Sequence, residues 1–258
     1  MELISPSELA KEKLLSVQEY ASLAADSVAN LFRKPRYFSD MLLQADLIGV
    51  GSLPIVTLTG LFTGMVLALN SASSLAQFGA TSLTGQLLSL SMIRELGPVF
   101  TGLMVAGRNA SGIASELGSM KVTEQIDAMR ALGTDPMKKL VVPRVVATVI
   151  MMFFLTILSD GFGLVGGWIF SAGLLGIPSS QYWHTSYQNL AFRDVFMGLL
   201  KPFFFGYIIA TIGCYYGMST TGGTQGVGRS TTQAMVVSSL LIIVVDLLVT
   251  RAVLVLLS

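Results

Sequence analysis

Five long apolar segments limit the folds open to this chain of 258 residues. About 20 consecutive apolar residues cross the hydrocarbon core of a bilayer as a helix. The third apolar region continues to residue 176, so it predicts either one long tilted helix or a helix followed by a re-entrant piece. We expect an all-α integral membrane protein whose transmembrane domain covers residues 37–258. The expected spans are at about residues 47–69, 87–106, 140–164, 195–216 and 235–257.

The composition favours a membrane protein and excludes several other classes. Only 12% of the residues are charged, about half of the roughly 25% found in soluble domains. The single cysteine, Cys214, lies in an apolar segment, which excludes a disulfide framework and a cysteine metal site. The mixed-charge start lacks the basic residues and apolar core of a cleavable signal peptide. No basic block or aromatic platform indicates binding to nucleic acid.

Motifs that could carry catalysis or bind a cofactor are few. The sole histidine, His184, has no acidic or cysteine neighbour at ligand spacing, so it predicts neither a metal ligand nor a base. Residues Gly223–Ser230 imitate a phosphate-binding loop, but Arg229 replaces the lysine and membrane segments flank the motif instead of a strand. We expect no metal, cofactor or nucleotide site in this chain, and no enzyme activity of its own.

The distribution of Lys and Arg predicts the orientation in the membrane, because these residues resist translocation. On the outer side only Arg193 lies between the expected spans. The N-terminus is therefore expected in the cytoplasm and, with five spans, the C-terminus on the outer face. The twelve basic residues on the expected cytoplasmic side are Lys11, Lys13, Arg33, Lys34, Arg36, Arg108, Lys121, Arg130, Lys138, Lys139, Arg144 and Arg229.

Residues 1–36 predict one amphipathic helix. Ser5, Pro6 and Glu8 fit a capping box, and Lys34-Pro35 ends the pattern. We expect this helix to lie on the cytoplasmic membrane surface; the alternative is a solvated helix packed on a partner. Its apolar positions at three-and-four spacing are Leu14, Val17, Ala21, Ala24, Val28 and Leu31.

The cytoplasmic segment 108–139 between the second and third spans carries a second amphipathic pattern. Within Ser119–Gly133 the apolar residues share one face, and Gly133 followed by Asp135-Pro136 predicts a helix stop. About eleven residues would form a rod near 16 Å long, which suits a groove on another protein. The alternative is a surface helix that only closes the loop. The apolar face consists of Val122, Ile126, Met129 and Leu132, with Glu124 among the polar residues.

Ionisable residues also fall inside or at the edges of the apolar segments. Each costs several kcal/mol in lipid unless it is paired or hydrated. A pair of Lys201 with Asp246 or with Glu95 is expected, and the sequence does not choose between them. The charges serve either to hold helices together or to contact a polar headgroup. The set is Arg94, Glu95, Asp160, Lys201, Asp246 and Arg251.

Small-residue motifs predict close helix packing. Glycines four residues apart share a helix face, and the alternative use of such a face is a dimer interface. The pairs are Gly60 and Gly64, Gly163 and Gly167, and Gly213 and Gly217.

Three stretches together resemble the MlaE/YrbE family of ABC permeases. The longest is Leu88–Arg144, which contains RELGPVFTGLMVAGRNASGIASELGSM. The others are TGLFTGMVLALN (Thr59–Asn70) and GVGRSTTQAMV (Gly226–Val236). The likeness covers most of the chain from about residue 35 onward, in order and with matching spacing.

This resemblance implies a permease subunit that forms a homodimer in the inner membrane and moves phospholipid or a related lipid between that membrane and the outer envelope. It implies a cytoplasmic ABC ATPase as partner, which would bind ATP and Mg, and an MCE-domain protein on the outer side. A small STAS-type subunit acting through the ATPase is a further expected partner. The turn at residues 222–232 would be the family's Gly-rich, Arg-containing cytoplasmic motif.

The resemblance also implies roles for particular residues. The residues expected in or near the lipid cavity are Leu67, Glu95, Leu96, Lys201 and Asp246. The residues expected to couple to the ATPase are Glu116, Val122, Glu124, Ile126, Met129 and Leu132. On this reading, aspartate at Ile126 and Met129 together should release the ATPase and leave the permease folded.

Two other functions stay open at this point. The first is an ion-coupled secondary transporter in which Glu95, Lys201 and Asp246 relay a proton or ion. The second is a membrane anchor for an envelope assembly, which transports nothing. An anchor would tolerate neutralisation of Lys201 and Asp246, whereas a transporter would not.

Overall fold

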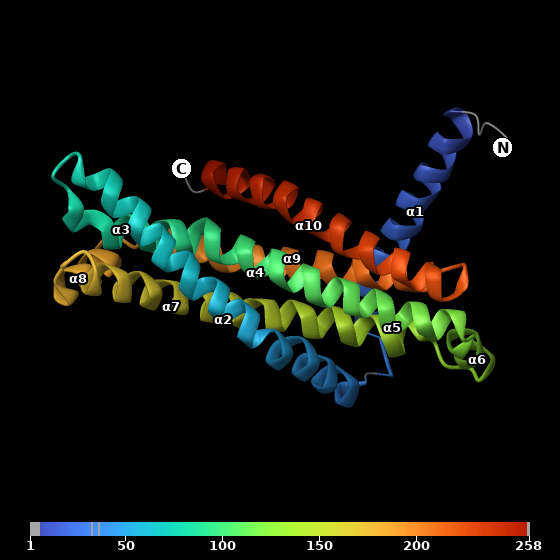
Figure 1. Cartoon of the computed structure of the whole chain (residues 1–258). Coiled ribbons are helices and arrows are strands. Elements are labelled where there is room, and N and C mark those ends of the chain that lie inside the picture. Colours follow the sequence, from blue (N-terminus) through green and yellow to red (C-terminus); the bar gives the residue numbers. More distant parts are fainter. Residues whose placement is uncertain (1–5, 32, 36, 257–258) are drawn as a thin grey trace.

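The computed structural model describes residues 6–31, 33–35 and 37–256 of the chain (Figure 1). In this part every regular element is helical, and five helical stretches are long and apolar enough to cross a membrane. The expected all-α membrane fold is therefore confirmed. The stretches run over Phe38–Ala76, Thr81–Val122, Met137–Gly173, Phe192–Met218 and Gly223–Leu256.

Each membrane helix is longer than its apolar core. The first span, α2 (Phe38–Ala76), begins nine residues before the predicted start at residue 47. The third span continues without a break as α7 (Val142–Gly173), so the long-helix alternative is correct and the re-entrant piece is absent from the described residues. The fourth and fifth spans are α9 (Phe192–Met218) and α10 (Gly223–Leu256).

The second span is one helical rod with two π-helical turns, interruptions that the sequence analysis missed. A π turn holds one more residue than an α turn and shifts the register of side chains that follow it. The rod is capped at its start by a short 3₁₀ turn, η1 (Thr81–Leu83). In order, the rod contains α3 (Thr84–Ser91), η2 (Met92–Leu96), α4 (Gly97–Val105), η3 (Ala106–Ala110) and α5 (Ser111–Val122).

Short helices cover the two ends of the bundle. In Figure 1, α8 (Ser179–Gln188) lies at one end and α6 (Gln125–Ala131) at the other. The third span begins at the α6 end with a further π turn, η4 (Met137–Val141). The two terminal helices differ in position. Helix α1 lies near the α6 end, whereas α10 runs from that end toward the α8 end (Figure 1).

The N-terminal helix, α1 (Pro6–Leu31), confirms the predicted helix but leaves the bundle at a steep angle (Figure 1). Ser5, the expected N-cap, lies outside the described residues. The second half of α1 is fastened to α9: the Tyr20 and Thr211 hydroxyls lie 3.1 Å apart, and Tyr207 donates to the Ala24 carbonyl at 2.7 Å. Burial raises the pKa of the Tyr20 hydroxyl.

Glycines allow α2 and α7 to approach backbone to backbone. A Cβ atom on Gly64 would lie 1.9 Å from the Gly163 carbonyl oxygen, and one on Gly60 would lie 2.5 Å from the Ser159 carbonyl oxygen. Gly213 and Gly217 face α5 in the same manner. The predicted packing role of these motifs is confirmed, and their small faces are occupied within the chain.

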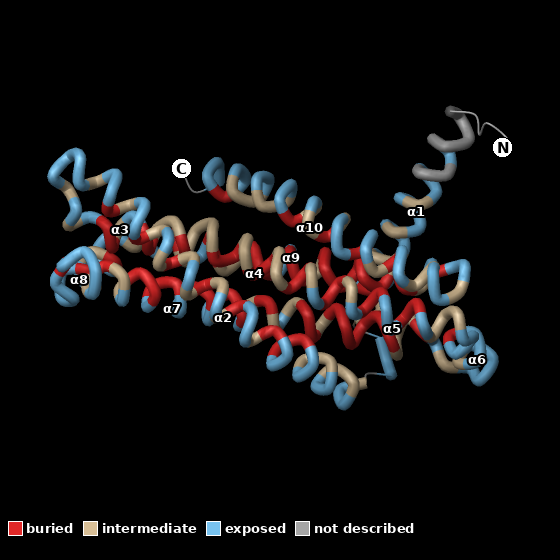
Figure 2. Tube along the Cα trace, viewed as in Figure 1, coloured by how far each residue is buried: buried red, intermediate tan, exposed pale blue. Residues whose placement is uncertain are grey.

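The fifth span is the least buried of the five (Figure 2). Its first half packs on α5 and α9, whereas its second half presents a row of aliphatic side chains to the surroundings. This face requires lipid or another protein to cover it. The most exposed of these side chains are Leu240, Ile243, Val244, Leu247 and Leu248.

Substitution of Gly64 tests the contact between α2 and α7. We expect Gly64→Ala to lower the thermal unfolding midpoint in detergent, because the neighbouring atoms belong to backbone and overpacking costs about 1–3 kcal/mol. Gly161→Ala on α7 is the matched control, since nothing lies within 4 Å of its added Cβ. Circular dichroism during heating measures both variants, and an equal midpoint for both would contradict this packing.

Candidate functional site

The most deeply buried charge of the described chain, the Lys201 ammonium group, lies between two carboxylates in the middle of the bundle. Its side chain is 0% exposed, and Nζ lies 2.5 Å from Glu95 Oε2 and 2.8 Å from Asp246 Oδ1. The three residues come from α9, η2 and α10. Both pairings that the sequence left open are therefore present at once.

A proline explains the third contact of Lys201. In an α-helix the N–H of Pro98 would donate to the carbonyl of Arg94, but proline has no N–H. Lys201 Nζ takes its place and donates to Arg94 O at 2.8 Å. The carbonyl lies within η2, where the π turn opens the backbone ladder. The site thus combines two side chains with a main-chain oxygen that Pro98 leaves without its helical partner.

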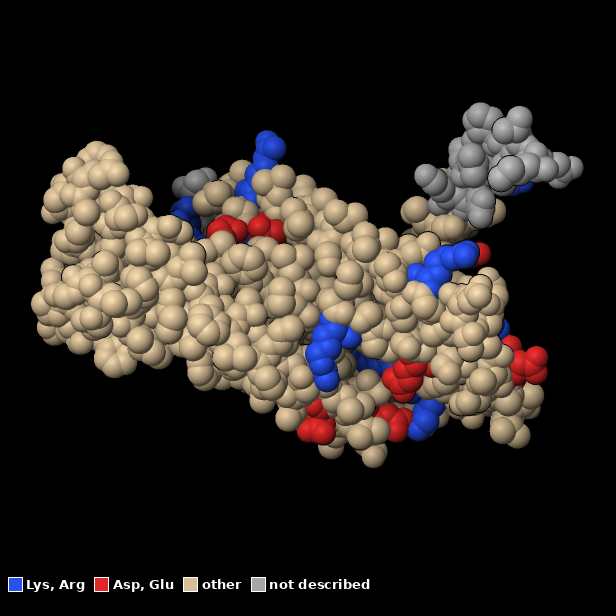
Figure 3. All heavy atoms as spheres, in the orientation of Figure 1, with Lys and Arg blue, Asp and Glu red and all other residues tan. Residues whose placement is uncertain are grey.

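The site carries one positive and two negative groups when all are ionised. Glu95 is 38% exposed and Asp246 19%, so both carboxylates reach toward the surroundings while the lysine does not. Thr250, one turn after Asp246, donates to Glu95 Oε1 at 3.3 Å. Figure 3 shows charged side chains of both signs near the middle of an otherwise largely uncharged face, with most other charges toward the α6 end. The exposed part of this site is acidic.

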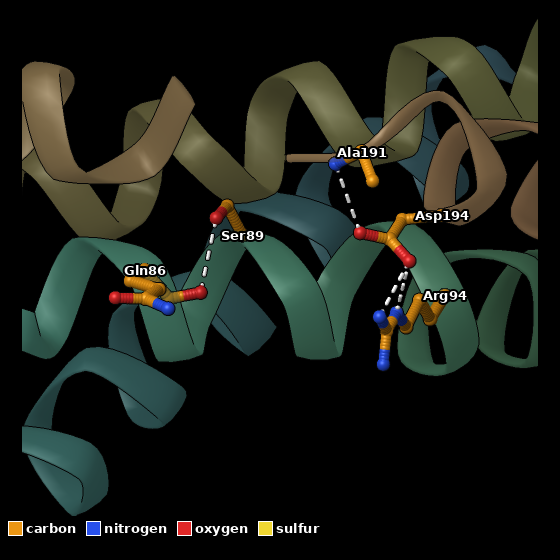
Figure 4. A network of polar contacts seen from close by, with 5 residues as sticks. All are labelled: Gln86, Ser89, Arg94, Ala191 and Asp194. Atoms are coloured by element: carbon orange, nitrogen blue, oxygen red, sulfur yellow. Dashed lines mark hydrogen bonds and ion pairs between the residues drawn. The ribbon is translucent and has the colours of Figure 1, made fainter. Parts of the chain in front are cut away.

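A second ion pair joins the second span to the fourth. Arg94 donates through Nε and Nη2 to Asp194 Oδ1 at 2.8 and 2.5 Å, and Asp194 Oδ2 accepts from the Ala191 N–H at 3.0 Å (Figure 4). Asp194 thereby caps the start of α9 while it neutralises Arg94. The sequence analysis did not assign Asp194 a role, although a carboxylate three residues into a helix is a known capping signal.

The two apolar residues expected in the cavity lie elsewhere in the packing. Leu67 of α2 and Leu96 of η2 are half-buried and pack on a cluster that contains Ala68, Leu88 and Leu164. Leu96 adjoins Glu95 in sequence, but Leu67 belongs to the α2–α7 side of the bundle. The structure therefore brings together Glu95, Lys201 and Asp246 of the five expected residues.

Asp160 stays outside this network. Its side chain is 8% exposed on α7, and its Oδ1 atom has no hydrogen-bond partner within the described part of the chain. A Cβ on Gly97 would lie 1.6 Å from Oδ1, so this glycine makes room for the carboxyl group.

The segment between the second and third spans forms a helical hairpin where the sequence predicted one rod. The second span continues to Val122, turns at Glu124 with a φ of 59°, and returns as the seven-residue α6. Gly133, with a φ of 78°, ends the hairpin as predicted. The amphipathic helix is therefore shorter than the expected eleven residues.

The apolar face of this hairpin points into the protein. Ile126 is 1% exposed and packs with Leu117 and Leu140, and Met129 packs against the same cluster. The expectation that aspartate at Ile126 and Met129 would leave the fold intact is therefore wrong, since a buried charge there would lack a partner. Leu132, in contrast, is 84% exposed.

Ion pairs fix the hairpin in place. Asp127 accepts from Lys121 at 2.9 Å and from Arg130 at 3.3 Å, and the hydrogen bond from Lys121 lowers the pKa of Asp127. At the base, Glu116 pairs with the buried Arg144 at 2.8 Å. Glu116, for which the family resemblance implied a role in ATPase coupling, thus links the second span to the third.

A further polar junction joins the first and second spans. Arg108, in η3, donates to Leu47 O and to Ser52 Oγ, each at 3.1 Å, and Asn109 donates to the same hydroxyl at 3.3 Å. The sequence analysis counted Arg108 only as a cytoplasmic charge. Its position three residues before the start of α5 gave no sign of a contact with α2.

Metal binding finds no support in the residues that the structure describes. Among them, no group of three or more His, Cys, Asp and Glu side chains lies close enough together to hold an ion.

Comparisons with known proteins agree on one family. A family profile described as "Permease MlaE" matches residues 41–252. A probable ABC transporter permease protein of Rickettsia bellii is 43% identical over 236 residues, which cover 92% of this chain and 91% of the relative. The intermembrane phospholipid transport system permease protein MlaE of Haemophilus influenzae is 35% identical and covers 83% of each chain.

A plant relative extends the comparison. The chloroplastic protein TRIGALACTOSYLDIACYLGLYCEROL 1 of Arabidopsis thaliana is 35% identical over 224 residues, which cover 87% of this chain and 64% of the relative. The profile match, these identities and the five membrane-length helices lead to one conclusion: the chain belongs to the MlaE family of permeases.

Proposed function

We propose that this chain is the permease subunit of an ABC transporter that moves phospholipid between the inner membrane and the outer envelope. The Haemophilus influenzae relative, whose name specifies phospholipid transport, supports the substrate class. The observation that carries the proposal is the partly exposed acidic site built around Lys201 at mid-span. A charge at that depth is costly and points to function.

The residues of this site would have different roles. Lys201 is 0% exposed, and its three contacts tie α9 to the second and fifth spans. Its role would therefore be to hold these helices together. Glu95 is the most exposed member and would meet the headgroup. An acidic contact favours a headgroup that carries an amine next to its phosphate. Leu96, which adjoins Glu95 in sequence, would contact acyl chains, and Leu67 would do so from the α2–α7 side of the bundle.

Energy would come from a separate ATPase that docks on the α5–α6 hairpin. The exposed tip offers Glu124 and Leu132, while Val122, Ile126 and Met129 support it from inside. Because Glu116 pairs with Arg144, a push on this hairpin would reach the second and third spans together. ATP and Mg would be bound by that partner.

The remaining partners follow from the proposed system. The bare aliphatic face of α10 would be covered by a second copy of the chain, forming a homodimer around the lipid path. An MCE-domain protein would meet the α8 end, on the outer side, and a STAS-type subunit would act through the ATPase. The basic residues near the α6 end support a cytoplasmic location for that end and for the N-terminus, with the C-terminus on the outer face.

An ion-coupled carrier is the second candidate, favoured by the two carboxylates that share one lysine. Purification from the native membrane in mild detergent, followed by mass spectrometry, separates the two. Co-purification of an ATPase and an MCE-domain protein with phospholipid supports the ABC transporter. A preparation without ATPase, whose transport collapses with an uncoupler, supports the carrier.

Separate substitutions at the acidic site should have different effects. We expect Glu95→Gln to leave the thermal midpoint near that of the parent and to slow lipid transfer between reconstituted vesicles about tenfold. Lys201→Met should instead lower the midpoint strongly, because removal of one partner from a buried pair costs about 3–5 kcal/mol. Adding Glu95→Gln and Asp246→Asn to Lys201→Met should recover part of that loss.

Arg251→Gln is the control for these variants, because Arg251 is an exposed charge near the end of α10, the helix that carries Asp246. Unchanged lipid transfer by Glu95→Gln in correctly folded protein would refute the headgroup role.

The hairpin tip provides a test of ATPase docking. We expect Leu132→Asp to keep the permease monodisperse and to weaken ATPase binding at least about tenfold, because an exposed apolar anchor is lost. Ile126→Asp should reduce folded protein instead. Leu174→Asp, 74% exposed in the segment after α7, is the matched control. Affinity capture measures the bound ATPase, and full retention by Leu132→Asp would exclude the tip as the docking site.

A further inference from the structure

An apolar groove opens where the end of α1 lies against α7 and α9. It encloses about 470 Å³. Two hydroxyl groups, those of Ser27 and Tyr207, also border it, and both donate to the Ala24 carbonyl at 2.7 Å. The groove therefore offers hydrocarbon contact almost exclusively. Its apolar walls include Val28, Leu31, Val142, Ile150, Phe203 and Phe204.

The length of the groove matches one leaflet of a bilayer. Its α7 wall runs from Val142 to Ile150, which is about 12 Å at the helical rise of 1.5 Å per residue. Half of the hydrocarbon core measures about 15 Å. On α9 the groove ends at Phe203, close to the mid-span position of Lys201, but Lys201 faces the second and fifth spans. The groove and the acidic site thus occupy different sides of α9.

Uncompensated positive charge gathers at one end of this groove. Arg33 and Lys34 come two and three residues after Leu31, and Lys138 Nζ donates to Lys34 O at 3.3 Å. No described carboxylate lies within 4.0 Å of these three cationic groups, whereas the neighbouring Lys139 pairs with Asp40. The acidic residues of α1 nearest this end, Glu19 and Asp26, line a separate hollow together with Met137.

We propose that this groove is a binding site for an anionic phospholipid, with one acyl chain between α1, α7 and α9. Arg33, Lys34 and Lys138 contact the phosphate. Basic side chains at a membrane surface favour anionic over zwitterionic lipid, and the apolar walls favour the chain. The lipid fills the angle between α1 and the bundle and fastens the helix. The proposal rests on the membrane placement given above and requires no transport.

Tryptophan quenching by brominated lipid tests the site in the full chain. Trp168 and Trp183 are replaced by phenylalanine, and Phe204→Trp supplies the only tryptophan, inside the groove. The matched control is Phe154→Trp on α7, since Phe154 is 53% exposed and Phe204 45%. Each protein is reconstituted in phosphatidylcholine vesicles with rising fractions of brominated phosphatidylglycerol or brominated phosphatidylcholine.

We expect the groove tryptophan to be quenched by brominated phosphatidylglycerol with at least about fivefold preference, the factor that a single basic contact at a membrane surface would give and that three contacts should exceed. The control tryptophan should show no preference. Combined Arg33→Gln, Lys34→Gln and Lys138→Gln should abolish the preference and leave quenching by brominated phosphatidylcholine unchanged. Equal quenching by both lipids, or a preference that survives the three substitutions, overturns the proposal.

A second measurement covers the case in which the tryptophan-free background does not fold. Native mass spectrometry of the otherwise unaltered chain counts phosphatidylglycerol molecules retained with and without the three glutamine substitutions. One fewer retained molecule supports the site, and an equal number overturns it. Neither measurement involves an ATPase or lipid transfer, so their outcome is independent of whether the proposed transport function holds.

Discussion

The Lys201 ammonium group is the interaction on which the arrangement of the second, fourth and fifth spans depends. A lone ammonium group in a low-dielectric interior is strongly unfavourable, and only close partners offset that cost. Glu95, Asp246 and the Arg94 carbonyl provide them from two other spans. Since no single helix contributes more than part of the set, these spans must assemble together for the charge to be accommodated.

A different kind of contact holds the first and third spans. There the backbones of α2 and α7 touch through Gly60, Gly64 and Gly163, and the ion pair between Asp40 and Lys139 lies apart from this contact, near the start of the two spans. Such packing depends on shape alone and leaves little freedom to slide. The protein therefore combines a tightly interlocked pair of helices with a group joined by ions, and α10 belongs to the second group with most of one face uncovered.

The sequence predicted the number of spans and the Gly133 stop, and it offered the extended third helix as one of two alternatives, because apolar length and helix-breaking residues are local signals. It also identified Lys201, Glu95 and Asp246 as partners, because buried charges must pair. It missed the π turns and the inward face of α6. An amphipathic stripe shows that a helix has an apolar side, but Ile126 shows that the stripe does not reveal whether the chain itself or a partner covers it.

The π turn at Met92–Leu96 has a consequence for how this region tolerates change. It holds one residue beyond the α-helical count, and each residue of an α-helix corresponds to a rotation of about 100°. Deleting one residue within the turn would restore a regular helix with the two parts of the span still aligned, because the wider turn absorbs its extra residue. Leu88 would then keep its place in the cluster, but the opened backbone that presents the Arg94 carbonyl to Lys201 would close. The length of this stretch is therefore as much a part of the site as its side chains are.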